Sequence, residues 1–276
     1  MIWWLNQAVG VLIKIIFLPF SSLNTWMAMI VISLLTALLM LFIYKKTSNQ
    51  EGIKKVKNHI KACLLGIRLY QHDFRTLLSA QKELLLANGR YLLYNLKPLL
   101  IMIIPIFLIL AQLNLWFGHR PVRNDETFLL KVRFIESTEM EKIDLKLELP
   151  EGLVAETPVL RIIDKREADW RLRAEKPVNQ PLTILVNGER YLKEIPPLGK
   201  NLSRVSTIRV RRNLWPELLY PGEKPLPSDS VINRIELSLP EQRLYFLGIG
   251  FHWLVAYFIL SLIFGFALKG VFKVEI

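Results

Sequence analysis

Long uncharged apolar segments are the first pattern along the chain. Two of them, 25–44 and 98–118, enclose a polar stretch with helical periodicity. Each is about 20 residues long, which is the length of helix that crosses a hydrocarbon core of roughly 30 Å. A third segment, 244–268, also contains no Lys, Arg, Asp or Glu. We therefore predict a bundle of three transmembrane helices, one in each of these segments.

The first 24 residues are apolar but carry a narrow polar stripe. Asn6, Gln7, Gly10 and Lys14 fall on one side when successive residues are placed 100° apart. The early basic residues and the cleavage site of a signal peptide are missing. This pattern is typical of an amphipathic helix in the membrane interface, so we predict such a helix and a linker over residues 1–24. The alternative is a fourth span in which Lys14 snorkels.

Residues 45–97 have the pattern of two helices. Ser48 and Glu51 have the spacing of a capping box. Apolar residues then recur at spacings of three and four on both sides of a break near 70–73. We predict an antiparallel helical hairpin, or coiled coil, over 45–97.

Charge determines the predicted topology. The chain has a net charge of +12, and residues 45–97 hold 11 basic against 3 acidic residues, whereas residues 118–244 hold 22 against 20. An excess of Lys and Arg in a short loop marks the cytoplasmic side, whereas a nucleic-acid-binding face needs a basic folded surface. We predict a bacterial cytoplasmic (inner) membrane protein with its N-terminus outside or interfacial. Its hairpin and its tail (269–276) would be cytoplasmic, and no nucleic acid would bind.

Residues 119–243 alternate in polarity like β-strands. The NGE sequence at 187–189 predicts a hairpin turn. Short alternating segments separated by Pro and Gly predict an extracytoplasmic β-sandwich with an immunoglobulin-like fold. The predicted strands are 127–135, 142–149, 169–175, 182–192, 206–212 and 231–239.

Two sets of residues are candidates for binding. Polar and methionine side chains at helical spacing on the first two spans would line a groove that accepts a client's membrane segment. Basic side chains on the hairpin would form a docking arm for the ribosome, a nascent chain or anionic lipid. The plainer interpretations are hydrogen bonds to neighbouring helices and a solvated spacer. The groove candidates are Met29, Ser33, Thr36, Met40, Met102, Pro105 and Gln112, and the arm candidates are Lys54, Lys55, Lys57, Lys61, Arg68 and Arg75.

Motifs of catalysis and metal binding are missing from the sequence. There is no G-x-S-x-G, no H-E-x-x-H and no P-loop, and the one cysteine, Cys63, has no partner for a disulfide. The four histidines (His59, His72, His119 and His252) are dispersed along the chain. We predict no enzyme, no cofactor and no metal site, with Cys63 as a packing residue.

The order of these elements resembles the YidC/Oxa/Alb membrane-insertase superfamily, especially its compact archaeal and endoplasmic-reticulum branches. The residues that carry the resemblance are LPFSSLNTWMAMIVISLLTALLMLFIY, TSNQEGIKKVKNHIKACLLGIRLYQHDF and NLKPLLIMIIPIFLILAQL. The resemblance implies a non-catalytic insertase or chaperone with a polar intramembrane groove. The chain departs from the family in having no arginine in the first span and in carrying an additional β domain.

Two functions follow as hypotheses. The first is an insertase or chaperone that helps membrane proteins to insert or fold, with membrane lipid, nascent membrane proteins and the ribosome as partners. The alternative is a structural or interaction protein of the cell envelope, whose β domain recruits a protein partner that the sequence does not identify and whose helices only anchor it.

Overall fold

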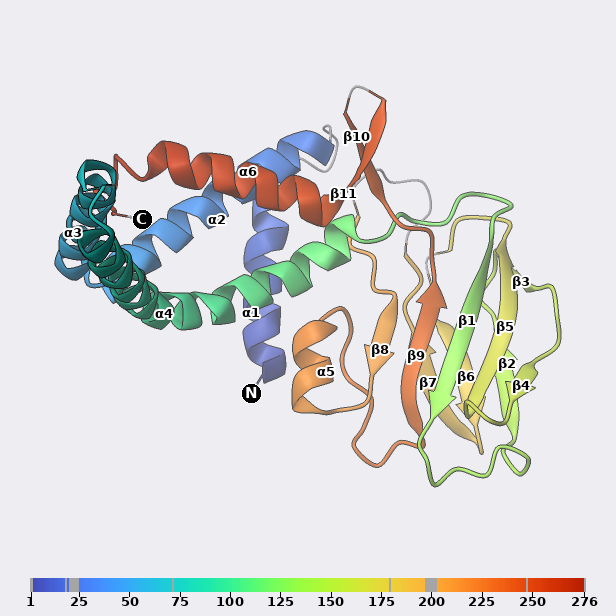
Figure 1. Cartoon of the computed structure of the whole chain (residues 1–276). Helices are drawn as coiled ribbons and strands as arrows, with labels where there is room; N and C mark the ends of the chain where they lie inside the picture. Colours follow the sequence, from blue (N-terminus) through green and yellow to red (C-terminus); the bar gives the residue numbers. More distant parts are fainter. Residues whose placement is uncertain are drawn as a thin grey trace. The chain divides into compact units, whose positions relative to one another are not determined.

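The computed structural model describes residues 2–17, 19, 25–70, 72–178, 180–196, 203–246 and 248–275. They form two compact units: a helical unit of residues 29–106 and 257–276, and a β unit of residues 1–28 and 107–256 (Figure 1). Residues 20–24, which include most of the predicted linker, lie outside the described residues.

Among the described residues, two helices are long and apolar enough to cross a membrane, α2 (Thr25–Thr47) and α4 (Phe74–Phe117). Only 39% of the apolar window of α2 and 28% of that of α4 are buried. A core helix of a water-soluble protein would be mostly buried, and a large exposed apolar surface is costly in water. Both helices therefore leave more than half of their apolar windows outside the protein core.

Helix α4 joins two elements that we predicted to be separate. Its 44 residues extend over roughly 66 Å at 1.5 Å per residue. They include both the second arm of the hairpin and the second predicted span. Pro98 and Pro105 lie inside the helix, where each removes one backbone hydrogen bond without ending it. The helix is thus continuous across the predicted boundary between residues 97 and 98.

The prediction of a third span over 244–268 is wrong in its first part. Strands β10 (Arg243–Phe246) and β11 (Ile249–His252) form an antiparallel hairpin there, and helix α6 begins only at Trp253 and ends at Leu268. Gly248 in the turn has φ +82°, a conformation that favours glycine. The 16 residues of α6 cover roughly 24 Å, less than a hydrocarbon core of about 30 Å.

The helical hairpin is confirmed, with a different cap. Helix α3 (Gln50–Leu69) lies antiparallel to the first part of α4, since Gly52 is close to Tyr94 while Cys63 is close to Glu83. The cap of α3 is Asn49, whose side-chain oxygen accepts from Gly52 N at 2.9 Å. The predicted capping box is wrong, because the Ser48 hydroxyl donates to Tyr44 O at 2.6 Å instead.

The predicted apolar seams of the hairpin are only partly buried. Ile53, Cys63 and Ala87 are buried. Many large apolar residues of the two arms remain exposed in the described structure: Leu64, Leu65, Leu69, Phe74, Leu78, Leu85, Leu86, Leu92 and Leu93. The hairpin therefore presents apolar side chains as well as basic ones.

The β unit contains two antiparallel sheets that share one core, which confirms the predicted sandwich. In the described residues the larger sheet has the order β3-β5-β1-β9-β8 with β4 beside β5, and the smaller has the order β2-β6-β7 (Figure 1). Leu130, Trp170 and Ile184 from the two sheets belong to a single buried cluster. The strands are β1 (Thr127–Phe134), β2 (Leu145–Glu148), β3 (Leu153–Ala155), β4 (Leu160–Ile162), β5 (Glu167–Ala174), β6 (Leu182–Val186), β7 (Glu189–Lys193), β8 (Ile208–Val210) and β9 (Ile232–Ser238).

The strands of the two sheets have the same neighbours as the strands of an immunoglobulin sandwich. Strands D, E and B of an immunoglobulin sheet are neighbours, as are C, F and G of the opposite sheet. The same neighbours occur here as β3-β5-β1 and β2-β6-β7, while β9, from the end of the domain, takes the place of strand A beside β1.

Local signals account for most of the strands. The turn predicted at NGE joins β6 to β7, with Asn187 at φ +50° and Gly188 at φ +86°. These two positive values are those of a type I′ turn. Between β8 and β9, Leu214–Leu219 form the short helix α5.

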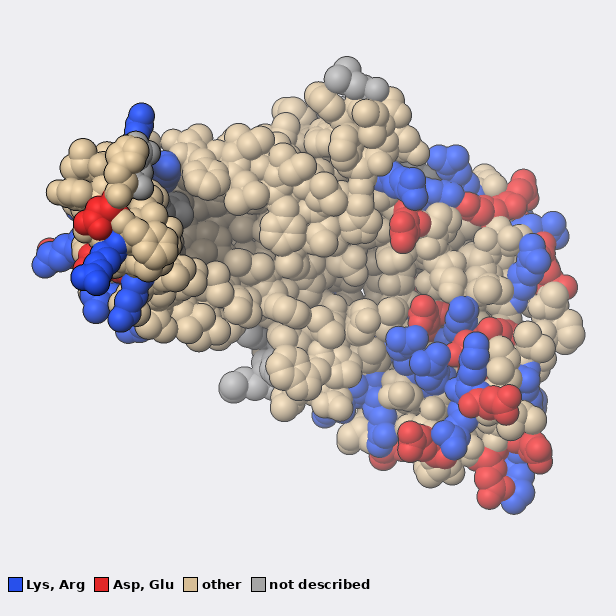
Figure 2. Space-filling view, in the orientation of Figure 1, with Lys and Arg blue, Asp and Glu red and all other residues tan. Residues whose placement is uncertain are grey.

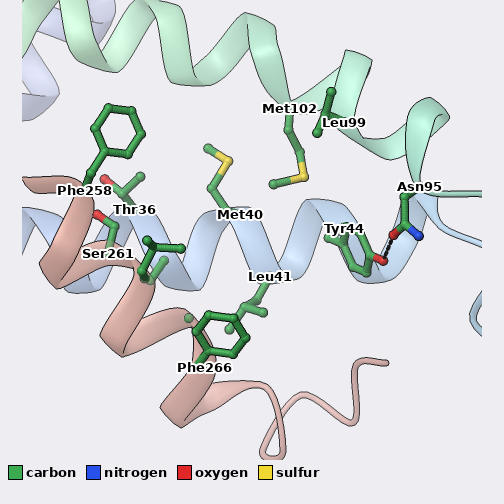
Figure 3. A pocket seen from close by; sticks show the side chains of 13 residues that line it. Thr36, Met40, Leu41, Tyr44, Asn95, Leu99, Met102, Phe258, Ser261 and Phe266 are labelled. Carbon is green, nitrogen blue, oxygen red and sulfur yellow. Dashed lines mark hydrogen bonds between the residues drawn. The ribbon is translucent and has the colours of Figure 1, made fainter. Parts of the chain in front are cut away.

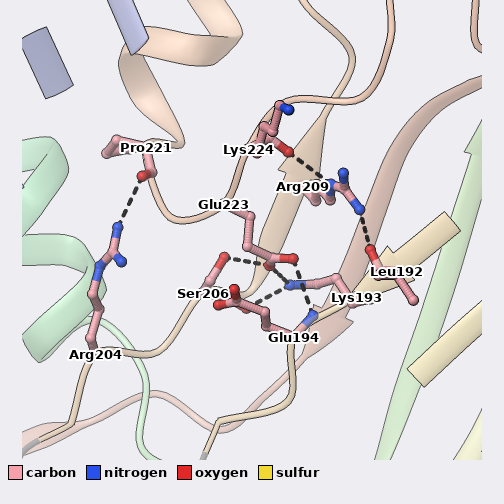
Figure 4. Close-up of polar contacts among 9 residues, drawn as sticks. All are labelled: Leu192, Lys193, Glu194, Arg204, Ser206, Arg209, Pro221, Glu223 and Lys224. Carbon is pink, nitrogen blue, oxygen red and sulfur yellow. Dashed lines mark hydrogen bonds and ion pairs between the residues drawn. The ribbon is translucent and has the colours of Figure 1, made fainter. Parts of the chain in front are cut away.

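A buried polar cluster joins the sheets to the loops beside α5 (Figure 4). Lys193, at the end of β7, has no exposed side-chain surface and forms an ion pair with Glu223. The Lys193 ammonium also donates to Ser206 O at 2.7 Å, and the Ser206 hydroxyl donates to the Glu223 carboxylate at 2.7 Å. Burial lowers the pKa of Lys193, and the Glu223 charge opposes this shift only in part. The cluster therefore depends on every partner being present.

The predicted N-terminal helix is present as α1 (Ile2–Phe17), and part of its polar stripe packs against protein. Its polar residue Asn6 is fully buried, donating to Glu217 O in α5 at 2.9 Å. Trp4, Val11, Leu12 and Ile15 are exposed instead. Asn6 and Gly10 of the polar stripe thus face protein, whereas Lys14 is exposed together with apolar side chains.

His119 makes the stability of the β unit dependent on pH. It lies just after α4, and its backbone pairs with that of Glu241 in an isolated antiparallel β-bridge. Its pKa is lowered from 6.5 mainly by burial, with Glu241 and Glu236 opposing the shift. The unfolded chain therefore binds this proton at a higher pH than the folded chain does, and stability is lost as the pH falls below 6.5.

We expect the β unit to unfold at lower denaturant concentration at about pH 5.5 than at about pH 7.5. Denaturant titration at the two pH values measures this, with His119→Gln as the comparison. The variant should lose most of the difference. An equal pH dependence in both proteins would assign it to other groups.

Candidate functional site

A cavity of about 450 Å³ lies in the helical unit, between α2, α4 and α6 (Figure 3). Its volume is in the range of small-molecule and side-chain binding sites. The residues that line it are Thr36, Ala37, Met40, Leu41, Tyr44, Asn95, Leu99, Met102, Phe258, Ser261, Leu262, Gly265 and Phe266.

Polar groups are few in the cavity, and three of them, on Thr36, Tyr44 and Asn95, have local partners, whereas the buried Ser261 hydroxyl has none among the described residues. The Thr36 hydroxyl donates to Ile32 O of its own helix at 2.8 Å. The Tyr44 hydroxyl donates to the Asn95 side chain (Figure 3), and the Asn95 amide donates to Tyr91 O at 2.7 Å. The remaining lining is mostly Leu, Met and Phe. The cavity is thus suited to apolar groups, rather than to the hydrophilic segments for which a polar groove is expected.

The structure brings together three of the seven predicted groove residues. Thr36, Met40 and Met102 line the cavity. Ser33 and Met29, one and two turns before Thr36 on α2, are fully buried in packed protein, and among the described residues the Ser33 hydroxyl has no hydrogen-bond partner. Pro105 is half-buried in α4 and is not among the lining residues.

Gln112 packs against α1 and lines no part of the cavity. Its side-chain amide donates to Asn6 O at 2.9 Å, and its side-chain oxygen lies 3.1 Å from the position that a Cβ at Gly10 would occupy. Gln112 was predicted to line a groove because of its helical spacing from Met102 and Pro105. In the structure its side chain instead joins α4 to α1 and is 1% exposed.

The predicted docking arm is largely accessible. Lys54, Lys55, Lys61, Arg68 and Arg75 are exposed. On the face in Figure 2, several Lys and Arg side chains lie on the hairpin among uncharged ones, whereas the surface over the long apolar helices is almost uncharged. The arm therefore presents basic groups beside the exposed apolar side chains described above.

The sixth arm residue, Lys57, contacts the C-terminal tail. Its ammonium pairs with Glu275 at 2.8 Å, and Glu275 N donates to the Gln50 side chain at 2.7 Å. Lys57, Lys54 and Lys61 lower the pKa of Glu275. This contact joins residues more than 200 positions apart, and no local sequence signal indicated it.

Ligand-type side chains meet between the arms of the hairpin, which the sequence did not predict. His59 and Cys63 of α3 and Glu83 of α4 have ligand atoms that all lie within 4.8 Å of one another. The i, i+4 spacing of His59 and Cys63 was visible in the sequence. Glu83 was not a visible partner, because it comes from the other arm.

A second pocket, of about 330 Å³, lies on the surface of the β unit. Arg211 and Arg212 line it, as do Arg133 and Arg234. Three of these arginines have partners: Arg133 pairs with Glu167, Arg234 with Glu236, and Arg211 donates to Ser228 O. The pocket is therefore lined mainly by basic and neutral polar side chains.

No model of a known protein family, no curated protein and no solved structure matches this chain.

Proposed function

We propose that this protein is a membrane insertase or chaperone that holds an apolar segment of a client membrane protein in the cavity between α2, α4 and α6. The cavity is the observation that carries the proposal. Low burial of the two long apolar helices supports a position in a bilayer.

The chemistry of the cavity defines the part of the client that it suits. Burial of a Leu or Phe side chain contributes about 1.5–3 kcal/mol relative to exposure in water. A lining of Leu, Phe and the adaptable Met40 and Met102 offers that burial to clients of varied sequence. We infer that the site receives apolar side chains at an early stage, before a client helix has packed against its own partners.

The arm would bring clients to this site. Exposed basic groups attract anionic lipid headgroups or the ribosome, and the exposed leucines beside them can contact a nascent apolar segment. The excess of Lys and Arg in this hairpin favours the cytoplasmic side of a bacterial inner membrane.

Site-specific photocrosslinking tests the proposal. A photoreactive residue at Met40 or Met102 is expected to capture nascent membrane proteins during their synthesis in cells. Met29 is the matched control, since it is also a methionine of α2 but is fully buried. Only background capture is expected there.

Two results would contradict the proposal. Equal capture at Met40 and Met29 would show that the cavity does not engage clients. Capture of one defined protein from Arg211 or Arg212, with none from Met40, would favour the alternative in which the β unit recruits a partner.

A further inference from the structure

The two arms of the hairpin meet at a set of side chains that are all metal-ligand types. Cys63 Sγ and His59 Nε2 are 3.8 Å apart on successive turns of α3. Glu83 approaches from α4, with all three ligand atoms within 4.8 Å of one another. Ligands of one tetrahedral zinc ion are about 3.3–3.6 Å apart, given Zn–S near 2.3 Å and Zn–N and Zn–O near 2.0–2.1 Å. Contraction of about 1 Å by side-chain rotation brings the set to that geometry.

The burial of the three groups suits a metal site with access from solvent. Cys63 is 6% exposed and lies between the arms, while His59 and Glu83 are exposed. An ion can therefore reach the site from solvent, and its bond to sulfur is shielded from competing water. Binding would release the thiol proton, because the thiolate is the ligand.

The ligand types select the class of metal. A thiolate, an imidazole and a single carboxylate favour zinc or a similar borderline-soft ion, whereas magnesium and calcium require mainly oxygen ligands. The thiolate and carboxylate together balance the two charges of the ion, which offsets the repulsion of a basic hairpin.

We propose that His59, Cys63 and Glu83 bind a divalent zinc ion that links the two arms of the hairpin. Three protein ligands leave the fourth position for water. Because the ion would bind the folded hairpin and not the separated arms, it would stabilise the hairpin by mass action.

Cobalt provides a direct spectroscopic test on the full-length chain in lipid nanodiscs, purified without a polyhistidine tag. Co²⁺ is expected to bind once per chain and to give thiolate-to-cobalt charge-transfer absorption that added Zn²⁺ abolishes. Cys63→Ser should remove this absorption. His59→Gln and Glu83→Gln should each weaken binding by roughly tenfold or more.

His59→Gln and Glu83→Gln keep the test interpretable, because both residues are exposed and their replacement leaves the packing between the arms intact. His72→Gln and Glu51→Gln are the matched controls, as both lie in the same hairpin outside the cluster, and they should bind cobalt like the unmodified chain. Absence of thiolate absorption in the unmodified chain would overturn the proposal. So would unchanged affinity in both His59→Gln and Glu83→Gln, since the thiol would then bind the ion alone.

Discussion

Replacement of Glu223 by alanine is expected to lower the free energy of unfolding of the β unit by about 3–5 kcal/mol, because it leaves the Lys193 charge buried without its partner. Lys193 has no exposed side-chain surface and Glu223 only 4%. The Glu223 carboxylate also accepts from the Ser206 hydroxyl at 2.7 Å and from Glu194 N at 3.1 Å, and these donors would be left without their acceptor. Hydrogen exchange of the β7 and β8 amides should accelerate by more than about 100-fold, given 1.4 kcal/mol per factor of ten.

A surface pair provides the matched control for this effect. Glu139 pairs with Lys142, but their side chains are 68% and 80% exposed. Glu139→Ala should cost no more than about 1 kcal/mol, since exposed ion pairs contribute little. The double variant Lys193→Met, Glu223→Leu should recover most of the loss, because it removes both buried charges. Equal effects of Glu223→Ala and Glu139→Ala would mean that the buried pair does not stabilise the unit.

Filling the cavity is expected to reduce client capture by about 10- to 100-fold. This range corresponds to the loss of one buried apolar side chain of about 1.5–3 kcal/mol, at 1.4 kcal/mol per factor of ten. Gly265→Trp is the appropriate change, since Gly265 lines the cavity and a Cβ at this position meets no atom within 4 Å. The first side-chain atom is therefore accommodated without displacing its neighbours. Photocrosslinking yield from Met102 measures the effect.

Gly89→Trp is the control for added bulk. Gly89 lies in α4 within the hairpin, and a Cβ there also meets nothing within 4 Å. This variant should leave the crosslinking yield unchanged. Undiminished yield in a folded Gly265→Trp protein would show that clients bind elsewhere.

The sequence predicted those parts of the fold that depend on local patterns. The apolar segment at 25–44, the break near 70–73 and the Asn187-Gly188 turn all match the structure, because length, periodicity and positive φ are encoded within a few residues. Strands β3 and β4 were missed, since three residues each are too few to show alternation.

The errors occurred where two local structures suit the same residues. Residues 244–252 are as apolar as a membrane helix, yet they form the β10–β11 hairpin, in which Trp26 donates to Tyr245 O at 2.8 Å and packs its ring against Phe246. A contact from a residue more than 200 positions away gives no periodic signal near 244. Hydrophobicity alone did not distinguish the two structures.

The candidate site, like the fold, was predicted from local pattern only in part. Methionines and small polar residues at helical spacing correctly indicated one face of α2. Along that face, Met29 and Ser33 are buried in packed protein, whereas Thr36 and Met40 line the cavity. Helical spacing specifies the side of a helix, while the neighbouring helices determine how far along that side the packing extends.

By itself, the sequence determined the apolar helices, the basic hairpin and the alternating strands of the sandwich, because each follows from interactions among neighbouring residues and from charge counts. Only the tertiary structure decided that Gln112 binds α1, that Glu275 contacts Lys57, and that Glu83 joins His59 and Cys63. These pairings depend on the path of the chain between distant residues. The physical reason is that side-chain chemistry is specified locally, whereas proximity is specified by the packing of the whole chain.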